Sequence, residues 1–138
     1  NLDSVISVYK YQFDDVEIAI DVNENLTMTG SEITLFQLWK NLILFSSKNY
    51  ETDQTDKFLR INAIDQVDTL QVQFHFNGIS IDQEIINEVD KIQSIEDKVN
   101  PDLNLKLGII KKIMTDHKGK LNIESSEGIT IFSLTFPK

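Results

Sequence analysis

The sequence contains no cysteine among its 138 residues. Disulfide scaffolds, thiolate zinc sites and cysteine nucleophiles are therefore excluded. The sequence also lacks any apolar run near the roughly 20 residues that a transmembrane helix needs. Its first residues, Asn1–Ser4, do not resemble a signal peptide. We therefore expect a cytoplasmic segment that does not insert into a membrane.

Positive charge is scarce. The chain has 13 Lys and Arg residues against 22 Asp and Glu residues, a net charge of -9, and Arg60 is its only arginine. Nucleic-acid binding needs clustered cations, so we expect no nucleic-acid partner. With 41% hydrophobic and 25% charged residues, the composition is that of a globular protein, and the length suits a single domain without a metal or disulfide staple.

The spacing of apolar residues predicts an alternation of strands and helices. Residues 70–76 alternate strictly, which is typical of a sheet with one buried and one wet face. The long central helix should follow a capping box at Thr29 and Glu32, and Gly119 should close the last helix. We expect strands at Val16–Val22, Leu26–Met28, Lys57–Ile64, Leu70–Phe76, Leu121–Ser125 and Ile129–Phe136, and helices at 3–13, 31–49, 82–91 and 105–117. This order predicts an α+β fold, a two-layer α/β sandwich with a mixed, mostly antiparallel sheet and helices on one face.

Four segments resemble a known family. Residues 37–46 (QLWKNLILFS) look like the N box of the histidine kinase ATP-binding domain, and residues 76–81 (FNGISI) fall at its first glycine box. Residues 117–125 (HKGKLNIES) resemble its His-Gly-Gly segment, and residues 127–137 (EGITIFSLTFP) resemble its closing strand. The resemblance implies one histidine kinase ATPase-like (GHKL, Bergerat-fold) domain over residues 1–138. Residues 1–14 would be a helix from a linker to an upstream domain, and residues 92–104 a lid-like loop.

The resemblance implies an ATP site whose magnesium is held by two Asn residues at i and i+4 of the long helix. Asn41 matches the first position, but the second is Phe45, and a phenyl ring cannot ligate a hard cation. Lys48 matches a basic position near the phosphates. The alternative is that Asn41 is an ordinary polar residue on a half-buried helix.

The resemblance also implies an Asp that accepts the adenine amino group, and Phe76 stands at its position. Asn77 and Gly78 follow, either as nucleotide contacts or as an ordinary turn after a strand. Side chains from Asp102 to Lys106 replace the glycines that the family uses around the phosphates. We hypothesise that Phe45, Phe76 and the leucines Leu103 and Leu105 meet in space and fill the former cleft. The alternative is that each of them faces a different neighbour.

The leading interpretation is a histidine kinase-like domain of a two-component signalling protein that has lost or weakened ATP binding and acts as an interaction or regulatory module. We then expect no cofactor and no catalytic residue. The alternative is an active sensor kinase domain that binds ATP and Mg²⁺ through Asn41, Lys48, Asn77 and Gly78, with Asn41 as the metal ligand, and phosphorylates a His on a separate domain. A third interpretation is another ATPase of the superfamily, such as an anti-sigma kinase.

The resemblance implies partners as well. These are a response regulator, or an upstream dimerisation and phosphoacceptor domain, within a homodimeric parent protein. The chain would then lie in the cytoplasm, including the case of the cytoplasmic part of a membrane-anchored sensor.

Overall fold

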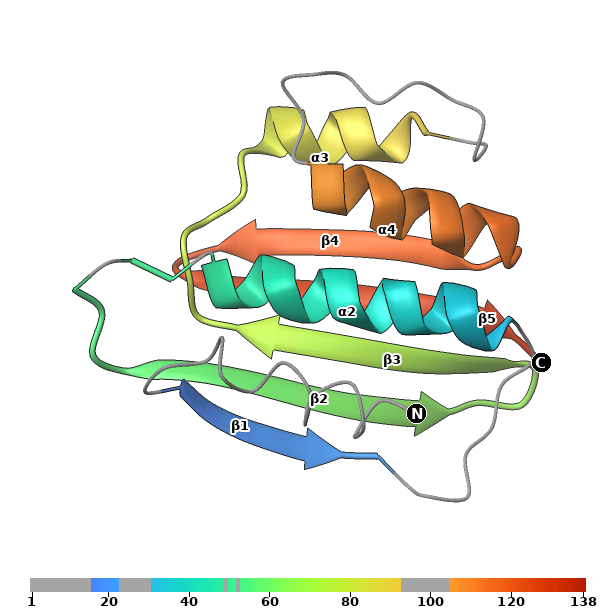
Figure 1. Ribbon diagram of the computed structural model, residues 1–138, viewed down its shortest axis with the longest axis horizontal. Helices are drawn as coiled ribbons and strands as arrows, with labels where there is room; N and C mark the ends of the chain where they lie inside the picture. The colour runs from blue at the N-terminus through green and yellow to red at the C-terminus, as the bar shows by residue number, and fades with distance from the viewer. Residues whose placement is uncertain (1–15, 23–30, 49, 52, 93–104) are drawn as a thin grey trace.

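The computed structural model of the protein describes residues 16–22, 31–48, 50–51, 53–92 and 105–138. Over these residues the elements follow in the order β1 (Val16–Asp21), α2 (Glu32–Lys48), β2 (Lys57–Asp65), β3 (Thr69–Phe76), α3 (Gln83–Asp90), α4 (Leu105–Asp116), β4 (Lys120–Ser126) and β5 (Ile129–Pro137). Figure 1 shows α2 and α4 side by side in front of the sheet, with α3 beyond α4.

The strands form one mixed five-stranded sheet in the order β1-β2-β3-β5-β4. β1 pairs with β2 in parallel, and the other three pairs are antiparallel. The parallel pair requires a crossover, which α2 supplies, whereas short turns join β2 to β3 and β4 to β5. The predicted α+β sandwich, mostly antiparallel with helices on one face, is therefore confirmed.

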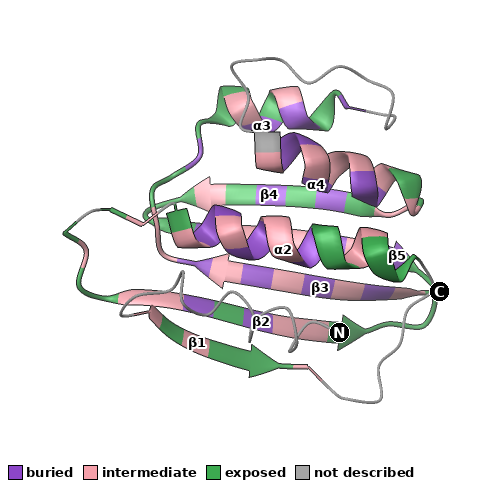
Figure 2. Ribbon diagram, in the orientation of Figure 1, coloured by how far each residue is buried: buried purple, intermediate pink, exposed green. Residues whose placement is uncertain are grey.

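Burial along the strands follows the period of two that the sequence predicts. In β3 every second residue from Leu70 to Phe76 is buried, and β5 repeats this pattern from Thr130 to Phe136. These rows face α2, whose Trp39 ring stacks on Phe74 with centroids 6.2 Å apart. Figure 2 shows buried positions along β3 and on α2 and α4, whereas β1 at the edge is mostly exposed.

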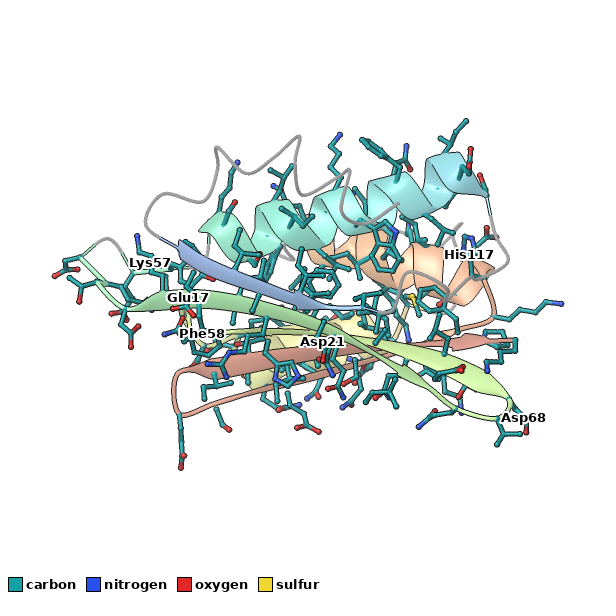
Figure 3. All side chains as sticks on the ribbon, turned by 90° about the horizontal axis from the view of Figure 1, so that it is seen from below. Glu17, Asp21, Lys57, Phe58, Asp68 and His117 are labelled. Atoms are coloured by element: carbon teal, nitrogen blue, oxygen red, sulfur yellow. The ribbon has the colours of Figure 1, made fainter. Side chains whose placement is uncertain are left out.

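No described helix covers the opposite face of the sheet, where polar side chains project (Figure 3). Gln73 and Gln71 on β3 form a hydrogen-bonded row that begins at His75 Nε2 and ends at Thr135 Oγ1 on β5. Arg60 lies opposite His75 in the β2–β3 register. Partial burial, and then the Arg60 charge, lower the pKa of His75 below its usual value. The imidazole therefore stays neutral near pH 7 and donates to Gln73.

The N-terminus of α2 is capped by Ser31. The Ser31 Oγ accepts a hydrogen bond from the Thr34 N–H at 3.3 Å, and the Ser31 carbonyl accepts the first helical bond from Leu35. Ser31 thus satisfies one of the free N–H groups of the first turn. The predicted cap, Thr29, lies outside the described residues.

The C-terminus of α4 ends in a Schellman motif. The Gly119 N–H donates to the Met114 carbonyl at 2.8 Å, and the Lys118 N–H donates to the Thr115 carbonyl at 3.0 Å. The left-handed residue is Lys118, with φ of 58°, and not the glycine that the sequence suggested. Gly119 has a different reason to be glycine, because a Cβ there would lie 2.7 Å from both Met114 Cε and the Thr135 carbonyl oxygen.

Most predicted elements are confirmed within one or two residues. The expected helix over residues 3–13, the strand Leu26–Met28 and residues 93–104 of the lid-like loop lie outside the described residues, and so they remain predictions. None of the described helices is both long and apolar enough to cross a bilayer.

Candidate functional site

An aromatic cluster occupies the end of the sheet where β3 finishes and β5 begins. Phe45 of α2 and Phe76, the last residue of β3, meet edge to face with ring centroids 6.1 Å apart and an interplanar angle of 77°. Phe132 of β5 touches both, at 5.5 Å from Phe45 and 6.0 Å from Phe76. Phe45 and Phe76 are only 3% and 1% exposed. The predicted contact between these two rings is therefore confirmed.

Phe45 belongs to the buried stripe of α2. It follows Leu38 and Leu42 at i+7 and i+3, the spacing that places side chains on one helix face. The apolar stripe of α2 is therefore wide enough to include Phe45, although the resemblance matches this position to a magnesium ligand.

Tyr50 covers the outer side of the cluster. Its ring lies edge to face on Phe76 with centroids 6.2 Å apart, and its hydroxyl donates a hydrogen bond to the Phe58 carbonyl. The Lys57 ammonium lies 5.9 Å from the centre of the Tyr50 ring. Burial raises the pKa of the Tyr50 phenol well above its usual value.

The raised Tyr50 pKa makes stability depend on alkaline pH. Above about pH 10 the unfolded chain loses the phenol proton while the folded state keeps it. The contribution of this phenol to the free energy of unfolding is therefore fully present below pH 10. It declines as pH rises further, by at most about 1.4 kcal/mol per pH unit. We expect the melting temperature to fall more steeply above pH 10 in the native protein than in Tyr50→Phe. Parallel melting curves against pH would contradict the burial of this hydroxyl.

The Asn77 carboxamide links the end of β3 to the start of β2. Its Oδ1 accepts from the Phe58 N–H at 2.7 Å, and its Nδ2 donates to the Asp56 carbonyl. Gln54 adds hydrogen bonds from its Nε2 to the carbonyls of Asp56 and Asn77. The backbone pairing of β2 with β3 ends at Leu59 and Phe76. The Asn77 side chain thus extends this pairing by one residue, to Phe58.

Asn41 and Lys48 have different surroundings from Asn77. The Asn41 Nδ2 donates to the Gln37 carbonyl one turn back on α2, at 2.7 Å, and the residue is half-buried. Lys48 is exposed in the last turn of α2, where a cation favours the helix dipole. Among the described residues, no group of three His, Asp or Glu side chains is placed to hold a metal ion.

The described residues do not test the predicted contribution of Leu103 and Leu105 to this cluster. Residues 93–104 lie outside the described residues, as does the side chain of Leu105. From Lys106 onward α4 is described, and Gly108 is buried inside it. The part of the hypothesis that joins these leucines to the phenyl rings stays a prediction.

A hydroxyl pair beside the cluster escaped the sequence reasoning. Thr130 Oγ1, fully buried on β5, lies 2.7 Å from Ser125 Oγ on β4, and Ser125 Oγ accepts the Ile81 N–H at 2.8 Å. These bonds tie the segment after Gly78 to the terminal hairpin. The sequence did contain a signal for this pair. Thr130 is a polar residue at one of the alternating buried positions of β5, two residues before Phe132.

Removing the Thr130 hydroxyl should weaken this tie. We expect Thr130→Val, which keeps the shape of the side chain, to lower the free energy of unfolding by about 0.5–1.5 kcal/mol. The exposed Ser126→Ala on the same hairpin serves as control and should change it by less than about 0.5 kcal/mol. Urea denaturation measures both. Equal effects of the two substitutions would show that the buried pair contributes nothing.

Comparison with solved structures identifies the architecture. The nucleotide-free catalytic domain of the histidine kinase ThkA superimposes with a TM-score of 0.81 at 19% sequence identity, over 99% of this chain and 91% of that chain. The chain has the fold of a histidine kinase catalytic domain. The mycobacterial sensor histidine kinase MprB matches with a TM-score of 0.78 at 15% identity, over 99% and 91% of the two chains.

The histidine kinase fold also forms part of much longer proteins. Full-length ShkA, solved in complex with AMPPNP, matches with a TM-score of 0.75 at 18% identity, and this chain covers 29% of it. No family sequence model and no curated protein matches the chain. At these identities the resemblance noted in the sequence is confirmed for the fold.

Proposed function

We propose that this chain is a histidine kinase-like domain of a two-component signalling protein in which ATP binding is lost or weak, and that it acts as an interaction or regulatory module. The observation that carries the proposal is the contact between Phe45 and Phe76. The resemblance assigns these two positions to a magnesium ligand and to the adenine acceptor. Two phenyl rings in contact supply neither an oxygen ligand nor a hydrogen-bond acceptor.

The hydrogen bonds of Asn77 support the same proposal. Its carboxamide oxygen accepts from the Phe58 N–H of β2, and its nitrogen donates to the carbonyl of Asp56, just before that strand. A nucleotide contact from Asn77 would break bonds to Phe58 and Asp56. The loss of an adenine acceptor, a metal ligand and the glycine-rich phosphate loop together should cost several kcal/mol, which turns a micromolar site into a millimolar one.

A second candidate is an active kinase domain. It is favoured by the ShkA structure, a protein of the same fold that holds the nucleotide analogue AMPPNP, and by the presence of Asn41 and Lys48. In that case Asn41 would contribute an oxygen to Mg²⁺, Lys48 would face the phosphates, and the groups around Gly78 would face the base. The nucleotide would supply the phosphoryl group to a His on another domain and leave as ADP, and the metal would offset the charge of the phosphates.

The partners follow from the proposed role. In either case the parent protein is proposed to be a homodimer that works with a response regulator, or with an upstream dimerisation and phosphoacceptor domain. The net charge of -9 means that such an interface either relies on apolar packing or pairs this acidic surface with a basic one.

A melting titration tests the proposal. Nucleotide at a hundred times its dissociation constant would stabilise a binding domain by about 2.7 kcal/mol, a shift of several degrees. We expect no shift for this chain with sub-millimolar ATP analogue and Mg²⁺. ShkA under the same conditions is the positive control. A rise of several degrees that saturates with nucleotide would favour the active kinase instead.

A further inference from the structure

We propose that residues 53–58 form a strap beside Tyr50 that opens as a unit while the β2–β3 pairing persists, and so releases Tyr50 from Phe76. The strap connects α2 to β2 and includes the first two residues of that strand. The proposal goes beyond the proposed function, because it holds whether or not the domain binds nucleotide.

The strap is fastened by a small set of side-chain hydrogen bonds and by the pairing of Lys57 and Phe58 with Val16 and Glu17 of the edge strand β1. Asn77 accepts a hydrogen bond from the Phe58 N–H and donates one to the Asp56 carbonyl. Gln54 donates hydrogen bonds to the carbonyls of Asp56 and Asn77. Tyr50 holds the Phe58 carbonyl. All of these fasteners therefore converge on the short stretch from Gln54 to Phe58.

Little apolar burial holds the strap in addition. Asp53, Thr55 and Asp56 are exposed, and Gln54, Lys57 and Phe58 are half-buried. The next residue inward, Leu59, is fully buried, and from there β2 pairs with β3. Segments with few buried apolar contacts and partly exposed hydrogen bonds open at a lower free energy than the whole domain. On the β3 side the boundary between strap and core thus falls between Phe58 and Leu59, and on the other side the strap meets the edge strand β1.

Opening of the strap changes the surface of the site. When Phe58 moves away, the Tyr50 hydroxyl loses its acceptor, and the Tyr50 ring is free to leave the edge of Phe76. The edge of the Phe76 ring is then exposed to solvent. The strap would act as a conformational control on this end of the sheet, next to the Glu17–Phe58 pair at the edge between β1 and β2 (Figure 3).

Amide hydrogen exchange at Phe58 and Phe74 tests the proposal. In the native protein the exchange rate of the Phe58 amide should depend less on denaturant concentration than the exchange rate of the Phe74 amide in the central strand β3. A weaker dependence indicates an opening smaller than global unfolding. Tyr50→Phe removes the bond to the Phe58 carbonyl and keeps the bond from the Phe58 N–H to Asn77. It should speed exchange at both amides about fivefold, because this bond is lost in strap opening and in global unfolding alike.

The matched control is Ile113→Val, a mild core change on α4 in a residue that is 2% exposed. This substitution lowers the free energy of global unfolding. The contacts that it weakens stay formed when only the strap opens. It should therefore speed exchange at Phe74 and leave Phe58 unchanged. The proposal is overturned if Ile113→Val speeds both amides equally, if Tyr50→Phe leaves Phe58 unchanged, or if Phe58 is unprotected in the native protein. None of these readouts involves nucleotide, so they are independent of the test of ATP binding.

Discussion

Replacing Phe45 by alanine should lower the free energy of unfolding by about 3–5 kcal/mol. The Phe45 ring is 3% exposed and contacts both Phe76 and Phe132. Its removal leaves a cavity between α2 and the sheet, because strands β3 and β5 are fixed by their ladders and cannot collapse into the gap. Urea denaturation followed by far-ultraviolet circular dichroism measures the loss.

The control for this substitution is a second phenylalanine on the same helix. Phe36 of α2 is 42% exposed, and Phe36→Ala should change stability by less than about 0.5 kcal/mol. Similar losses for Phe36→Ala and Phe45→Ala would contradict the aromatic cluster. Such a result would place Phe45 in a shallow, half-solvated position, where room for a ligand could remain.

Gly119→Ala is the second substitution with a large expected effect, about 1–3 kcal/mol of destabilisation. The added Cβ would lie 2.7 Å from the Thr135 carbonyl oxygen and from Met114 Cε. Met114 can move its terminal methyl group, but the Thr135 carbonyl is backbone of β5 and must shift with the sheet. Thermal melting detects the change.

The neighbouring residue provides a control with the opposite sign. Lys118 adopts φ of 58°, which disfavours a residue with a Cβ, so Lys118→Gly should stabilise by up to about 1 kcal/mol. If Gly119→Ala proved neutral, or if Lys118→Gly destabilised the protein, the assignment of left-handed and crowded positions in this Schellman motif would be wrong.

Much of the fold could be predicted because its signals are local. The alternation from Leu70 to Phe76 predicts both the strand and its buried face, and Glu127–Gly128 predicts the turn. There both residues adopt positive φ, 53° and 79°, as a two-residue hairpin requires. The contact of Phe45 with Phe76 was predictable only through the resemblance, since 31 positions of sequence separate the two rings.

The remainder of the site depends on contacts that no local pattern encodes. Asn77 gives the same turn signal whether its carboxamide is free or bonded to Phe58 and Asp56. Gln54 lies in a polar loop whose sequence does not show that its amide will reach the Asn77 carbonyl. Such hydrogen bonds form only once β2 and β3 are paired, and so the strap emerges from the three-dimensional structure alone.

The most direct test of the proposed loss of nucleotide binding is a nitrogen-15 NMR titration of the native chain with ATP and Mg²⁺ up to millimolar concentrations. The account predicts that any chemical-shift change at the amides of Asn41, Phe45, Phe76, Asn77 and Gly78 does not saturate below millimolar nucleotide. Saturable shifts that converge on these amides at micromolar nucleotide would contradict it, because the base and phosphates would then bind beside the two phenyl rings.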